Sequence, residues 1–385
     1  MRAVIDARPA LDPRRTGVGL YAQQIIRHLP HADPDHEYIA WYLHAKGLLR
    51  PRRFFEGIKA DNLSEKASRF PARVFGPLSS RVGVPRIEWS VDFDILLATN
   101  FLPPATHREG VVLVVHDLAH ERLTETAPHM NARWRRSFDR WLADAAGVIV
   151  PSEATRADLL AGHDVDPEQI HVTPLGVDVA AFSPSPDATV DAVRRKHGIT
   201  GPYALFVGGI EPRKNLENLV VAFASLAPGT RLVLAGGPVR WDPKASERLD
   251  EVIATLAPAA RARIVRTGYV SDQEKVALLT GATLLAYPSL YEGFGFPVLE
   301  GFAVGIPVLT SATSSLPEVA GEAAVLVDPR DTAAIAEGLA QLFDDEDLRA
   351  MLSAAGLIRA SKFTWERTAR LTAAALHAAH EQAPG

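Results

Sequence analysis

The chain has no cysteine among its 385 residues. Disulfide bridges, thiolate nucleophiles and cysteine-ligated zinc or iron–sulfur centres are therefore excluded, while the redox environment stays open. No uninterrupted apolar run approaches the roughly 20 residues that a membrane-spanning helix needs, so we do not expect the chain to cross a bilayer. The first six residues run directly into a strand pattern without the apolar core of a secretory signal, and we therefore expect a cytoplasmic location.

An excess of positive charge is also missing. The 41 Lys and Arg residues are outnumbered by 46 Asp and Glu residues, which gives a formal net charge of -5 and argues against a nucleic-acid partner. The sequence contains neither Gly-x-Ser-x-Gly nor a Walker Gly-Lys-Ser/Thr, so the usual signatures of serine hydrolases and P-loop NTPases are absent. An apolar fraction of 47% and a charged fraction of 23% are typical of a folded globular protein.

Short β-branched runs alternate with amphipathic stretches of helix length along nearly the whole chain. This rhythm is typical of parallel sheets covered by helices, and it occurs twice, which predicts an α/β protein with two doubly wound, Rossmann-like sheets in series. The strands are predicted at Ala3–Asp6, Tyr38–Tyr42, Ile95–Ala98, Val111–His116, Val148–Pro151, Ile170–Thr173, Tyr203–Gly208, Arg231–Ala235, Arg263–Thr267, Thr283–Tyr287, Pro307–Thr310 and Ala324–Val327.

The length of the chain exceeds what one hydrophobic core usually supports, so two domains are expected. A stretch rich in Pro, Ser and Asp lies between them and has the composition of a linker. We predict an N-terminal Rossmann-like domain at 1–178, a linker at 179–200, a C-terminal Rossmann-like domain at 201–363, and a C-terminal helix at 364–385 that packs towards the N-terminal domain.

One loop stands out as a candidate site, because ligands of open α/β sheets bind beyond the carboxyl ends of the strands. In the segment from Glu292 to Glu300, two glycines permit close approach of the backbone, and Pro297 suits the first turn of a helix. The bare amides of a helix N-terminus favour a phosphate or a sugar hydroxyl. Both carboxylates can accept hydrogen bonds from hydroxyl groups, although a plain turn with two solvated carboxylates fits about equally well.

Two further loops carry glycines between a strand and a helix. The first loop contains Gly208, Arg213 and Lys214, and its two cationic side chains suit a diphosphate. The second contains Gly17 and Gly19, which lack the third glycine of a dinucleotide fingerprint and indicate close approach to a single phosphate instead.

Two patterns imitate metal sites. His116 and His120 have the spacing of zinc ligands on a helix, but His116 ends a strand. We therefore expect His116 to point into a cleft between the two domains, and we expect no metal ion there. Asp92 and Asp94 imitate an Asp-x-Asp metal motif, but they precede a strand and lie at its wrong end. Strand-edge solvation is the simpler explanation.

Together these residues resemble glycosyltransferase family 4, a group of retaining enzymes with the GT-B fold that includes many bacterial mannosyl- and glucosyltransferases. The resemblance covers most of the chain, and the carboxylate pair in its Glu-Gly-Phe-Gly setting is its most specific mark. The marks are Gly17-Val-Gly19, His116-Asp117, Pro151-Ser152-Glu153, Pro174-Leu-Gly176-Val-Asp178, Pro212-Arg-Lys214-Asn215, Thr267-Gly-Tyr-Val270, Glu292 with Glu300, and Leu316-Pro-Glu318-Val.

The resemblance implies two GT-B domains facing a cleft, with the donor bound mainly by the C-terminal one. Glu300 would hold the ribose hydroxyls of a nucleotide sugar. Glu292 and the amides of Gly293, Phe294 and Gly295 would contact the transferred sugar.

The resemblance also implies the phosphate and base ends of this site. Lys214, assisted by Arg213, would bind the diphosphate, with Gly17 and Gly19 facing it from the other domain. Val270 and its neighbours would bracket the base. No cofactor and no metal ion are expected, because protein cations and helix termini neutralise the leaving diphosphate.

The catalytic set implied by the resemblance is His116, Glu292 and Lys214. Transfer would proceed with retention through an oxocarbenium-like front-side displacement in which the leaving phosphate helps deprotonate the acceptor, so Glu292 is not expected to act as a covalent nucleophile. One departure weakens the phosphate end: Gly209 stands where family members commonly have Arg. Arg213 is the candidate to compensate.

Donor and acceptor are less sharply indicated. The resemblance is strongest to mannosyltransferases of surface polysaccharide biosynthesis, so GDP-mannose is the leading donor, with UDP-glucose open, and a glycan or lipid-linked oligosaccharide is the expected acceptor. The stretches 46–55 and 133–141 mix cations with aromatic residues, which suits either peripheral contact with an anionic membrane or solvated amphipathic helices. A sugar-nucleotide epimerase and a non-catalytic nucleotide-sugar-binding protein remain the alternative functions.

Overall fold

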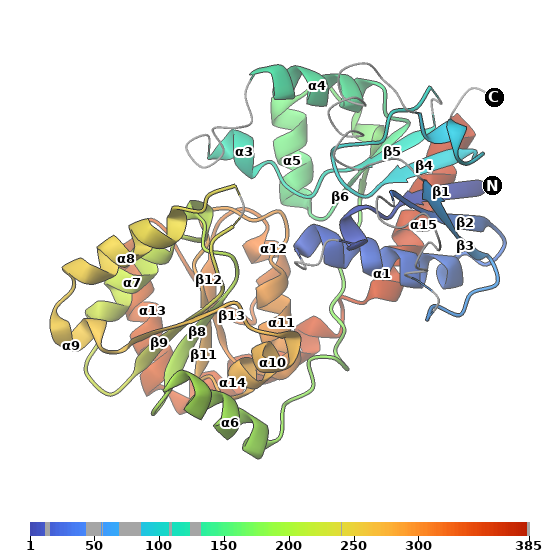
Figure 1. Ribbon diagram of the computed structural model, residues 1–385. Helices are drawn as coiled ribbons and strands as arrows, with labels where there is room; N and C mark the ends of the chain where they lie inside the picture. Colours follow the sequence, from blue (N-terminus) through green and yellow to red (C-terminus); the bar gives the residue numbers. More distant parts are fainter. Residues whose placement is uncertain are drawn as a thin grey trace. The chain divides into compact units, whose positions relative to one another are not determined.

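The computed structural model describes residues 1–11, 16–43, 55, 57–68, 86–107, 110–123, 132–239 and 241–382. The chain forms two compact units (Figure 1). The first comprises Met1–Leu118, His129–Gly176 and Trp365–Gly385, and the second comprises Ala119–Pro128 and Val177–Thr364. Each unit is built around one sheet whose paired strands are all parallel, which confirms the prediction of two doubly wound sheets.

The first unit contains a seven-stranded sheet in the order β3-β2-β1-β4-β5-β6-β7. Six of its strands were predicted from apolar runs. The strands are β1 (Arg2–Asp6), β2 (Glu37–Leu43), β3 (Leu63–Ser68), β4 (Ile95–Ala98), β5 (Val111–Val114), β6 (Gly147–Val150) and β7 (Ile170–Val172).

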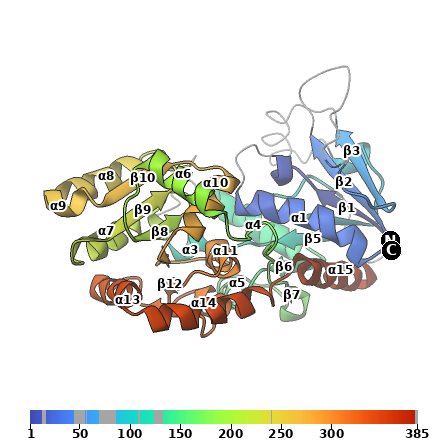
Figure 2. The same ribbon diagram turned by 90° about the horizontal axis from the view of Figure 1, so that it is seen from below.

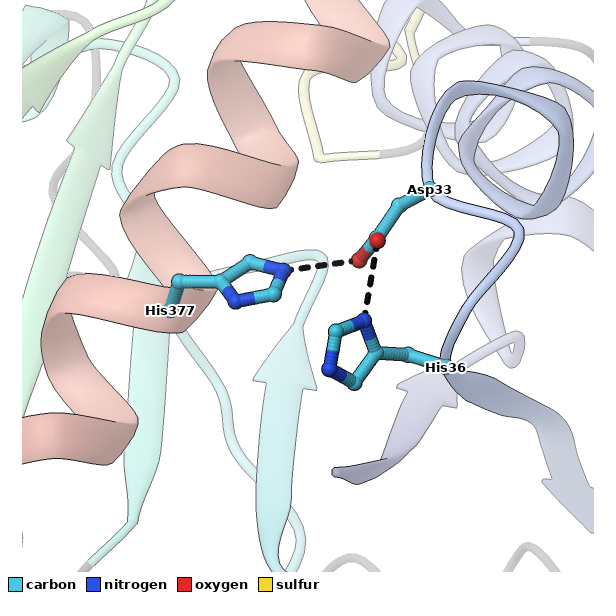
Figure 3. Close-up of side chains that lie close together, drawn as sticks. All are labelled: Asp33, His36 and His377. Atoms are coloured by element: carbon cyan, nitrogen blue, oxygen red, sulfur yellow. Dashed lines mark hydrogen bonds and ion pairs between the residues drawn. The ribbon is translucent and has the colours of Figure 1, made fainter.

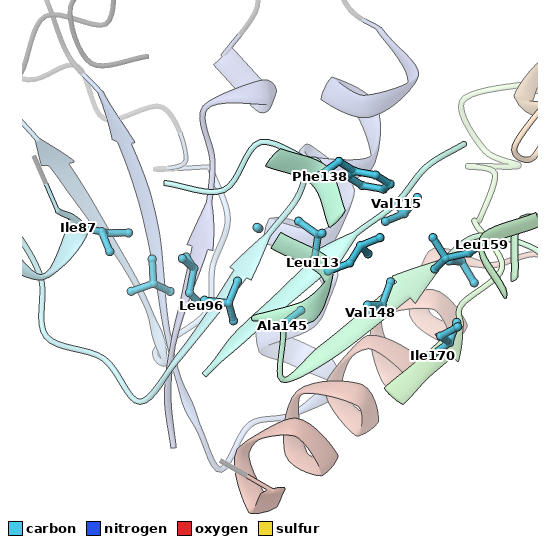
Figure 4. Packing of buried hydrophobic residues seen from close by; sticks show 14 of the residues in the cluster. Ile87, Leu96, Leu113, Val115, Phe138, Ala145, Val148, Leu159 and Ile170 are labelled. Atoms are coloured by element: carbon cyan, nitrogen blue, oxygen red, sulfur yellow. The ribbon is translucent and has the colours of Figure 1, made fainter. Parts of the chain in front are cut away.

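Helices cover both faces of this sheet. Two long helices, α1 and α15, pack against each other on one face, although they come from opposite ends of the chain. On the other face, α4 and α5 close over a core cluster that includes Phe138 and Leu159 (Figure 4). The helices are α1 (Gly17–Ala32), α4 (Ala132–Ala143), α5 (Glu153–Gly162) and α15 (Trp365–Gln382), with short 3₁₀ turns at Pro9–Leu11, Ile87–Trp89 and Pro167–Gln169.

The second unit contains a six-stranded sheet in the order β10-β9-β8-β11-β12-β13. This order places β8 and β11 side by side at the centre, where the direction of winding reverses and ligands bind in such sheets. The strands are β8 (Tyr203–Val207), β9 (Arg231–Ala235), β10 (Ile264–Gly268), β11 (Leu284–Tyr287), β12 (Val308–Ser311) and β13 (Ala324–Val327).

Helices α7, α8 and α13 lie on one face of the second sheet, and α10, α11 and α12 lie on the other (Figure 1). The helices of this unit are α3 (Ala119–Arg122), α6 (Asp187–His197), α7 (Leu216–Ala224), α8 (Ala245–Thr255), α9 (Pro258–Arg261), α10 (Asp272–Thr280), α11 (Phe296–Val304), α12 (Leu316–Ala320), α13 (Thr332–Asp344) and α14 (Glu346–Ala360), with a 3₁₀ turn at Pro212–Lys214.

The structure differs from the sequence-based expectations in two segments. Strand β3 was not predicted, because its sequence LSEKAS is polar and it pairs only with β2 at the sheet edge. The segment expected as a linker contains α6, which buries Val190 and Val193 and packs beside α10 (Figure 2). Arg14 and most of the basic, aromatic stretch 46–55 lie outside the described residues.

Candidate functional site

The carboxyl ends of β8 and β11 carry the densest group of buried charges in the second unit. Lys214 ends the 3₁₀ turn that follows β8, and Glu292 lies in the loop that follows β11. Because the two strands are neighbours and parallel, their following loops meet at the same edge of the sheet. The sequence singled out both loops, and the structure brings their charged side chains into contact.

Glu292 is held by three side chains. Its Oε1 accepts a hydrogen bond from Lys214 Nζ at 2.5 Å and one from the Tyr287 hydroxyl at 2.9 Å. Its Oε2 accepts a bond from Arg213 Nη1 at 2.7 Å. Lys214 Nζ also donates to the Tyr287 hydroxyl at 2.5 Å, while Arg213 Nε pairs with Glu211 at 2.8 Å. We call Glu211, Arg213, Lys214, Tyr287 and Glu292 the Glu292 network.

Four of the five residues of the Glu292 network are buried and Arg213 is partly buried, and the pKa values of Lys214, Tyr287 and Glu292 are shifted. Burial alone would raise the pKa of Glu292, but the nearby Arg213 and Lys214 charges lower it to about 2, so this carboxylate is ionised at neutral pH. Burial lowers the pKa of Lys214, with Glu292 and Glu211 opposing that shift. Burial and the neighbouring carboxylate raise the pKa of Tyr287, which keeps its phenol protonated and donating. The network therefore holds two carboxylates and two cations next to a neutral phenol.

The loop carrying Glu292 is tied to the end of the next strand. The Glu292 backbone N–H donates to Ser314 Oγ at 3.0 Å, and Ser314 has a left-handed φ of 54°. The Ser315 hydroxyl lies 2.9 Å from the carbonyl oxygens of both Glu292 and Phe294. Gly295, at a φ of 108°, then starts α11, and a Cβ there would lie 2.7 Å from Leu316. Backbone constraints thus fix the position of the carboxylate before α11 begins.

The predicted donor-binding residue Phe294 has a structural side chain. It is buried and makes edge-to-face contacts with Phe296 and Phe363 at centroid distances of 6.1 and 5.8 Å. Only the backbone of Phe294, like that of the neighbouring glycines, is suited to contact a ligand in this arrangement.

Glu300 does not join the Glu292 network. It lies in α11, is buried, and accepts a hydrogen bond from Lys275 Nζ at 2.6 Å. Lys275 comes from α10 and sits 4.9 Å from the centroid of the Phe182 ring. The two glutamates singled out in the sequence therefore occupy separate environments, each with its own cationic partner.

Gly209 is confined by the chain itself. A Cβ at this position would lie 2.7 Å from Val239 Cγ1, closer than real Cβ contacts. The larger side chain common in the family thus needs Val239 to move. The guanidinium that does reach this loop is that of Arg213, which bonds to both Glu292 and Glu211.

In the first unit, His116 follows β5 and is anchored to the neighbouring strand. Its Nε2 donates to the Thr99 carbonyl at 2.8 Å, and its ring packs edge-to-face with Tyr21 at 5.0 Å. Burial lowers the pKa of His116, with the Thr99 hydrogen bond opposing the shift. The neutral ring therefore carries its proton on Nε2 and leaves Nδ1 as a lone-pair acceptor.

An ion pair with a buried carboxylate lies two strands away from His116. Asp6 ends β1 and binds the guanidinium of Arg8 in bidentate fashion, at 2.8 and 2.7 Å. The Thr99 hydroxyl donates to the Asp6 carbonyl at 2.6 Å, so Thr99 joins this pair to His116. The sequence analysis did not single out Asp6, Arg8 or Thr99.

Gly17 and Gly19 form the first turn of α1. Thr16 caps this helix, because its Oγ1 accepts a bond from Gly19 N at 3.2 Å. A Cβ at Gly19 would lie 2.9 Å from the Pro9 carbonyl oxygen, so close approach of the backbone requires glycine there. Gly17 is exposed at the end of the helix.

Val270 follows β10 and is partly buried, and the adjacent Tyr269 is 71% exposed. Ser271 then starts α10 through a capping box with Glu274. The exposed ring of Tyr269, one of the neighbours included in the prediction for Val270, therefore lies at this strand end.

The residues of the two metal-like patterns lie at different places in the fold. Asp94 accepts a bond from the Arg2 backbone N–H at 2.6 Å, and Asp92 lies 4.0 Å from the Arg2 guanidinium, both at the amino end of β1. His116 and His120 belong to different units.

In α4, which contains the stretch 133–141, the aromatic residues and the arginines differ in burial. Its aromatic residues Trp134, Phe138 and Trp141 pack in the core cluster of the first unit, whereas Arg136 and Arg140 are exposed. The ring of Trp134 stacks on Phe138 at 5.1 Å. The aromatic side chains are thus committed to the fold. Within the described part of the chain, no helix is long and apolar enough to span a membrane.

Two residues in contact with the predicted glutamates escaped the sequence analysis. Tyr287 is the last residue of a buried strand, where an aromatic residue is ordinary core material. Lys275 lies in the first turn of α10, just after the exposed start of that helix, where a lysine is ordinary surface. Their signal was positional: Tyr287 ends the strand that leads to Glu292, and Lys275 follows the capped helix start after Val270.

Both halves of the chain match known glycosyltransferase families. Residues 15–181 match the family described as Glycosyltransferase Family 4, and residues 190–358 match the family described as Glycosyl transferases group 1. O-antigen chain mannosyltransferase B of Escherichia coli is 31% identical over 274 residues, covering 69% of this chain and 70% of that protein. D-inositol 3-phosphate glycosyltransferase of Corynebacterium efficiens is 29% identical over 330 residues, covering 82% and 76%.

Solved structures share the fold at low sequence identity. Anabaena HepE in complex with UDP-glucose superposes with a TM-score of 0.73 at 18% identity, covering 98% of this chain and 99% of that one. Sucrose-phosphate synthase from Thermosynechococcus elongatus gives 0.71 at 19% identity, covering 97% of each chain. With its two Rossmann-like units and both halves matched, the chain belongs to glycosyltransferase family 4 and has the GT-B fold.

Proposed function

We propose that the protein is a retaining glycosyltransferase that moves a hexose from a nucleotide sugar to a glycan or lipid-linked acceptor in polysaccharide biosynthesis. The observation that carries this proposal is the Glu292 network, in which an ionised carboxylate is fixed between two cations at the switch point of the second sheet. Mannose from GDP-mannose is our leading donor, and the likeness to the Escherichia coli mannosyltransferase supports that choice.

The proposed donor site extends along the strand ends of the second unit. Glu292 and the backbone of the Gly293–Gly295 turn bind the hydroxyls of the transferred sugar. Glu300, oriented by Lys275, binds the ribose, and the Val270 turn brackets the base. In this arrangement each buried carboxylate has a cationic partner beside it and oxygen atoms that accept hydrogen bonds.

In the free protein, the cations that would neutralise the diphosphate are already paired with carboxylates. Lys214 and Arg213 both contact Glu292, and Arg213 also contacts Glu211, so the network is close to neutral. We propose that Lys214 turns one of its three N–H donors to the diphosphate while keeping Glu292, and that Arg213 supplies the charge missing at Gly209. The N-terminal amides of α11 add a positive end of a helix dipole.

Transfer in this proposal needs no metal ion, because these cations and amides stabilise the leaving diphosphate. His116, neutral with a free Nδ1 acceptor, is suited to bind a sugar hydroxyl. The leaving phosphate takes the acceptor proton, so Glu292 forms no covalent intermediate.

We propose contact with an anionic membrane through the exposed arginines of α4 alone, since Phe138 is buried and Trp134 and Trp141 pack against the core cluster. Attraction of this kind is electrostatic and weakens with salt. Binding to vesicles that contain anionic lipid at low ionic strength, and release at high ionic strength, is the expected behaviour.

The test is a thermal-shift screen of the full chain with GDP-, UDP- and ADP-sugars, followed by a transfer assay without added Mg²⁺ or Mn²⁺. GDP-mannose should give the largest shift, and turnover should release GDP, with the product anomer read by NMR. Lipid-linked glycan and inositol phosphate serve as alternative acceptors. Stabilisation by sugar nucleotides without transfer or hydrolysis would indicate a binding protein, and an altered donor sugar without released diphosphate would indicate an epimerase.

Lys214→Ala and Arg213→Ala separate the two cations. Loss of a charged hydrogen bond corresponds to about 1.5–3 kcal/mol, or roughly ten- to a hundredfold in kcat/KM. We expect Lys214→Ala to reach the upper end and Arg213→Ala the lower end, because only Lys214 is bonded to Tyr287 as well. An unchanged rate for Arg213→Ala would remove that residue from the site.

A further inference from the structure

A second group of titratable side chains lies in the first unit, away from every residue proposed to bind the donor. Asp33 follows the C-terminus of α1, His36 precedes β2, and His377 belongs to α15 (Figure 3). Asp33 Oδ1 accepts a bond from His36 Nδ1 at 2.9 Å, and Oδ2 accepts one from His377 Nε2 at 2.8 Å. We call these three residues the Asp33 triad.

The ligand atoms of the Asp33 triad converge. One atom from each residue lies within 4.8 Å of the others, and the two imidazole rings meet edge to face at 4.5 Å. Neighbouring ligand atoms around a tetrahedral zinc ion are about 3.3 Å apart for bonds of about 2.0 Å. Small rotations of the side chains therefore bring all three onto one ion.

The surroundings hold the Asp33 triad in place. The Asn62 side chain donates to the carbonyl oxygens of Pro30, Asp33 and His36 at 2.9–3.2 Å, which fixes the turn that carries two of the three groups. The Tyr38 hydroxyl donates to Asp33 Oδ2 at 2.5 Å. A hydrogen bond of this kind to a ligating carboxylate orients it for a metal ion.

The Asp33 triad can be reached from solvent. The triad remains open to solvent, with side-chain exposures of 12% for Asp33, 24% for His36 and 36% for His377. An ion can therefore reach all three side chains.

We propose that Asp33, His36 and His377 bind one zinc ion, with water in the fourth position. Two imidazoles and one carboxylate are ligands that zinc favours, whereas magnesium and calcium require oxygen ligands. The triad lies at the amino ends of the strands, while His116 follows the carboxyl end of β5 in the same sheet. The zinc ion is therefore structural: it joins α15 to the α1–β2 turn and takes no part in transfer.

The test measures zinc on the whole protein and does not depend on donor or acceptor. After treatment with a chelator and buffer exchange, titration calorimetry with ZnCl₂ should show one ion per chain, and Co²⁺ should give the visible absorption of a tetrahedral site. Zinc should also raise the melting temperature, because binding to the folded state alone stabilises it.

Variants separate this site from adventitious binding to surface histidines. His377→Gln and His36→Gln should each weaken zinc binding by more than about tenfold and remove the thermal shift. His380→Gln, on the exposed side of the same helix, should behave like the wild type. If the wild type binds less than one ion, or if His377→Gln and His380→Gln bind equally, the triad is only a hydrogen-bonded tie between α15 and α1, and the proposal is wrong.

Discussion

The two sheets each bury charge beyond their central strands, but they pair it differently. In the first unit, Asp6 and Arg8 are two residues apart and form one bidentate pair. In the second, Glu292 is shared among Lys214, Arg213 and Tyr287, and the cations lie 78 and 79 residues away in the sequence. The Asp6–Arg8 pair needs only the local chain at the end of β1. The contacts of Glu292 with its two cations need β8 and β11 to be paired first. A shared carboxylate with distant partners is thus sensitive to the tertiary structure and to a ligand that competes for its cations.

We expect Glu292→Gln to have the largest effect on both stability and transfer. Removing the carboxylate leaves two buried cations short of a counter-charge, which lowers the free energy of unfolding by about 3–5 kcal/mol. We expect the transfer rate to fall by about 10²–10³-fold, as for loss of an essential polar contact in an active site. Urea unfolding and a transfer assay measure the two effects.

Asp6→Asn is the matched variant in the first unit, because Asp6 is fully buried and also paired. It should lower stability too, but leave stabilisation by the donor nucleotide intact, since we place the nucleotide in the second unit. Equal loss of nucleotide binding in both variants would contradict the division of roles between the two units.

The stability difference between wild type and Glu292→Gln should depend on pH. Because the pKa of Glu292 is lowered from 4.5 to about 2, its ionised form stabilises the folded state above pH 4.5. That contribution is lost as the pH falls from 4.5 towards 2. Urea unfolding at stepwise lower pH should therefore show the two proteins converge, and a constant difference over this range would mean that the network does not stabilise the carboxylate.

Tyr287→Phe should have a smaller effect. The substitution removes the hydroxyl between Lys214 and Glu292 but keeps the ring, which stacks on Phe206 at 5.7 Å. We expect a loss of about 1–3 kcal/mol in stability and a drop in kcat of roughly tenfold. Phe206→Leu, which alters the same stack without touching the network, should reduce stability and spare kcat. A normal kcat for Tyr287→Phe would show that the cations position Glu292 without the phenol.

Gly209→Ala is the mildest test of the second unit. The new Cβ meets Val239, and overpacking of this kind costs about 1–3 kcal/mol. The double variant with Val239→Ala should recover most of that stability, as seen by thermal unfolding. If the single variant is already as stable as the wild type, space around Val239 does not explain why glycine occupies this position.

The sequence was most informative where burial is continuous. Strands such as β8 and β11 are buried along their whole length, so apolar runs predicted them. The edge strand β3 alternates between exposed and partly buried positions in a polar sequence, and its only reason to be a strand is its pairing with β2. Helix α6 lies where Pro and Ser suggested a linker, because two buried valines are too weak a pattern to predict a helix.

Most residues of the site could be predicted from the sequence, but the contacts between them could not. Glu292, Lys214 and Arg213 were singled out because each follows a strand, yet nothing local in the sequence shows that one carboxylate binds both cations. Tyr287 was hidden among core residues. The restriction at Gly209 depends on Val239, 30 residues away, which only the folded loop brings close.

The placement of α15 also sets an order of events during synthesis. This helix covers the first sheet, but it is translated after all of the second unit, whose larger part is Val177–Thr364. At ribosomal speeds of about 5–20 residues per second, translating the residues between the first sheet and α15 takes on the order of ten to forty seconds. During this time the face of the first sheet beside α1 is not yet covered by α15. The second unit is nearly continuous in sequence and can complete its core in that interval. The N-terminal half of this chain is therefore the last to finish folding, and its uncovered face is where a chaperone would be needed.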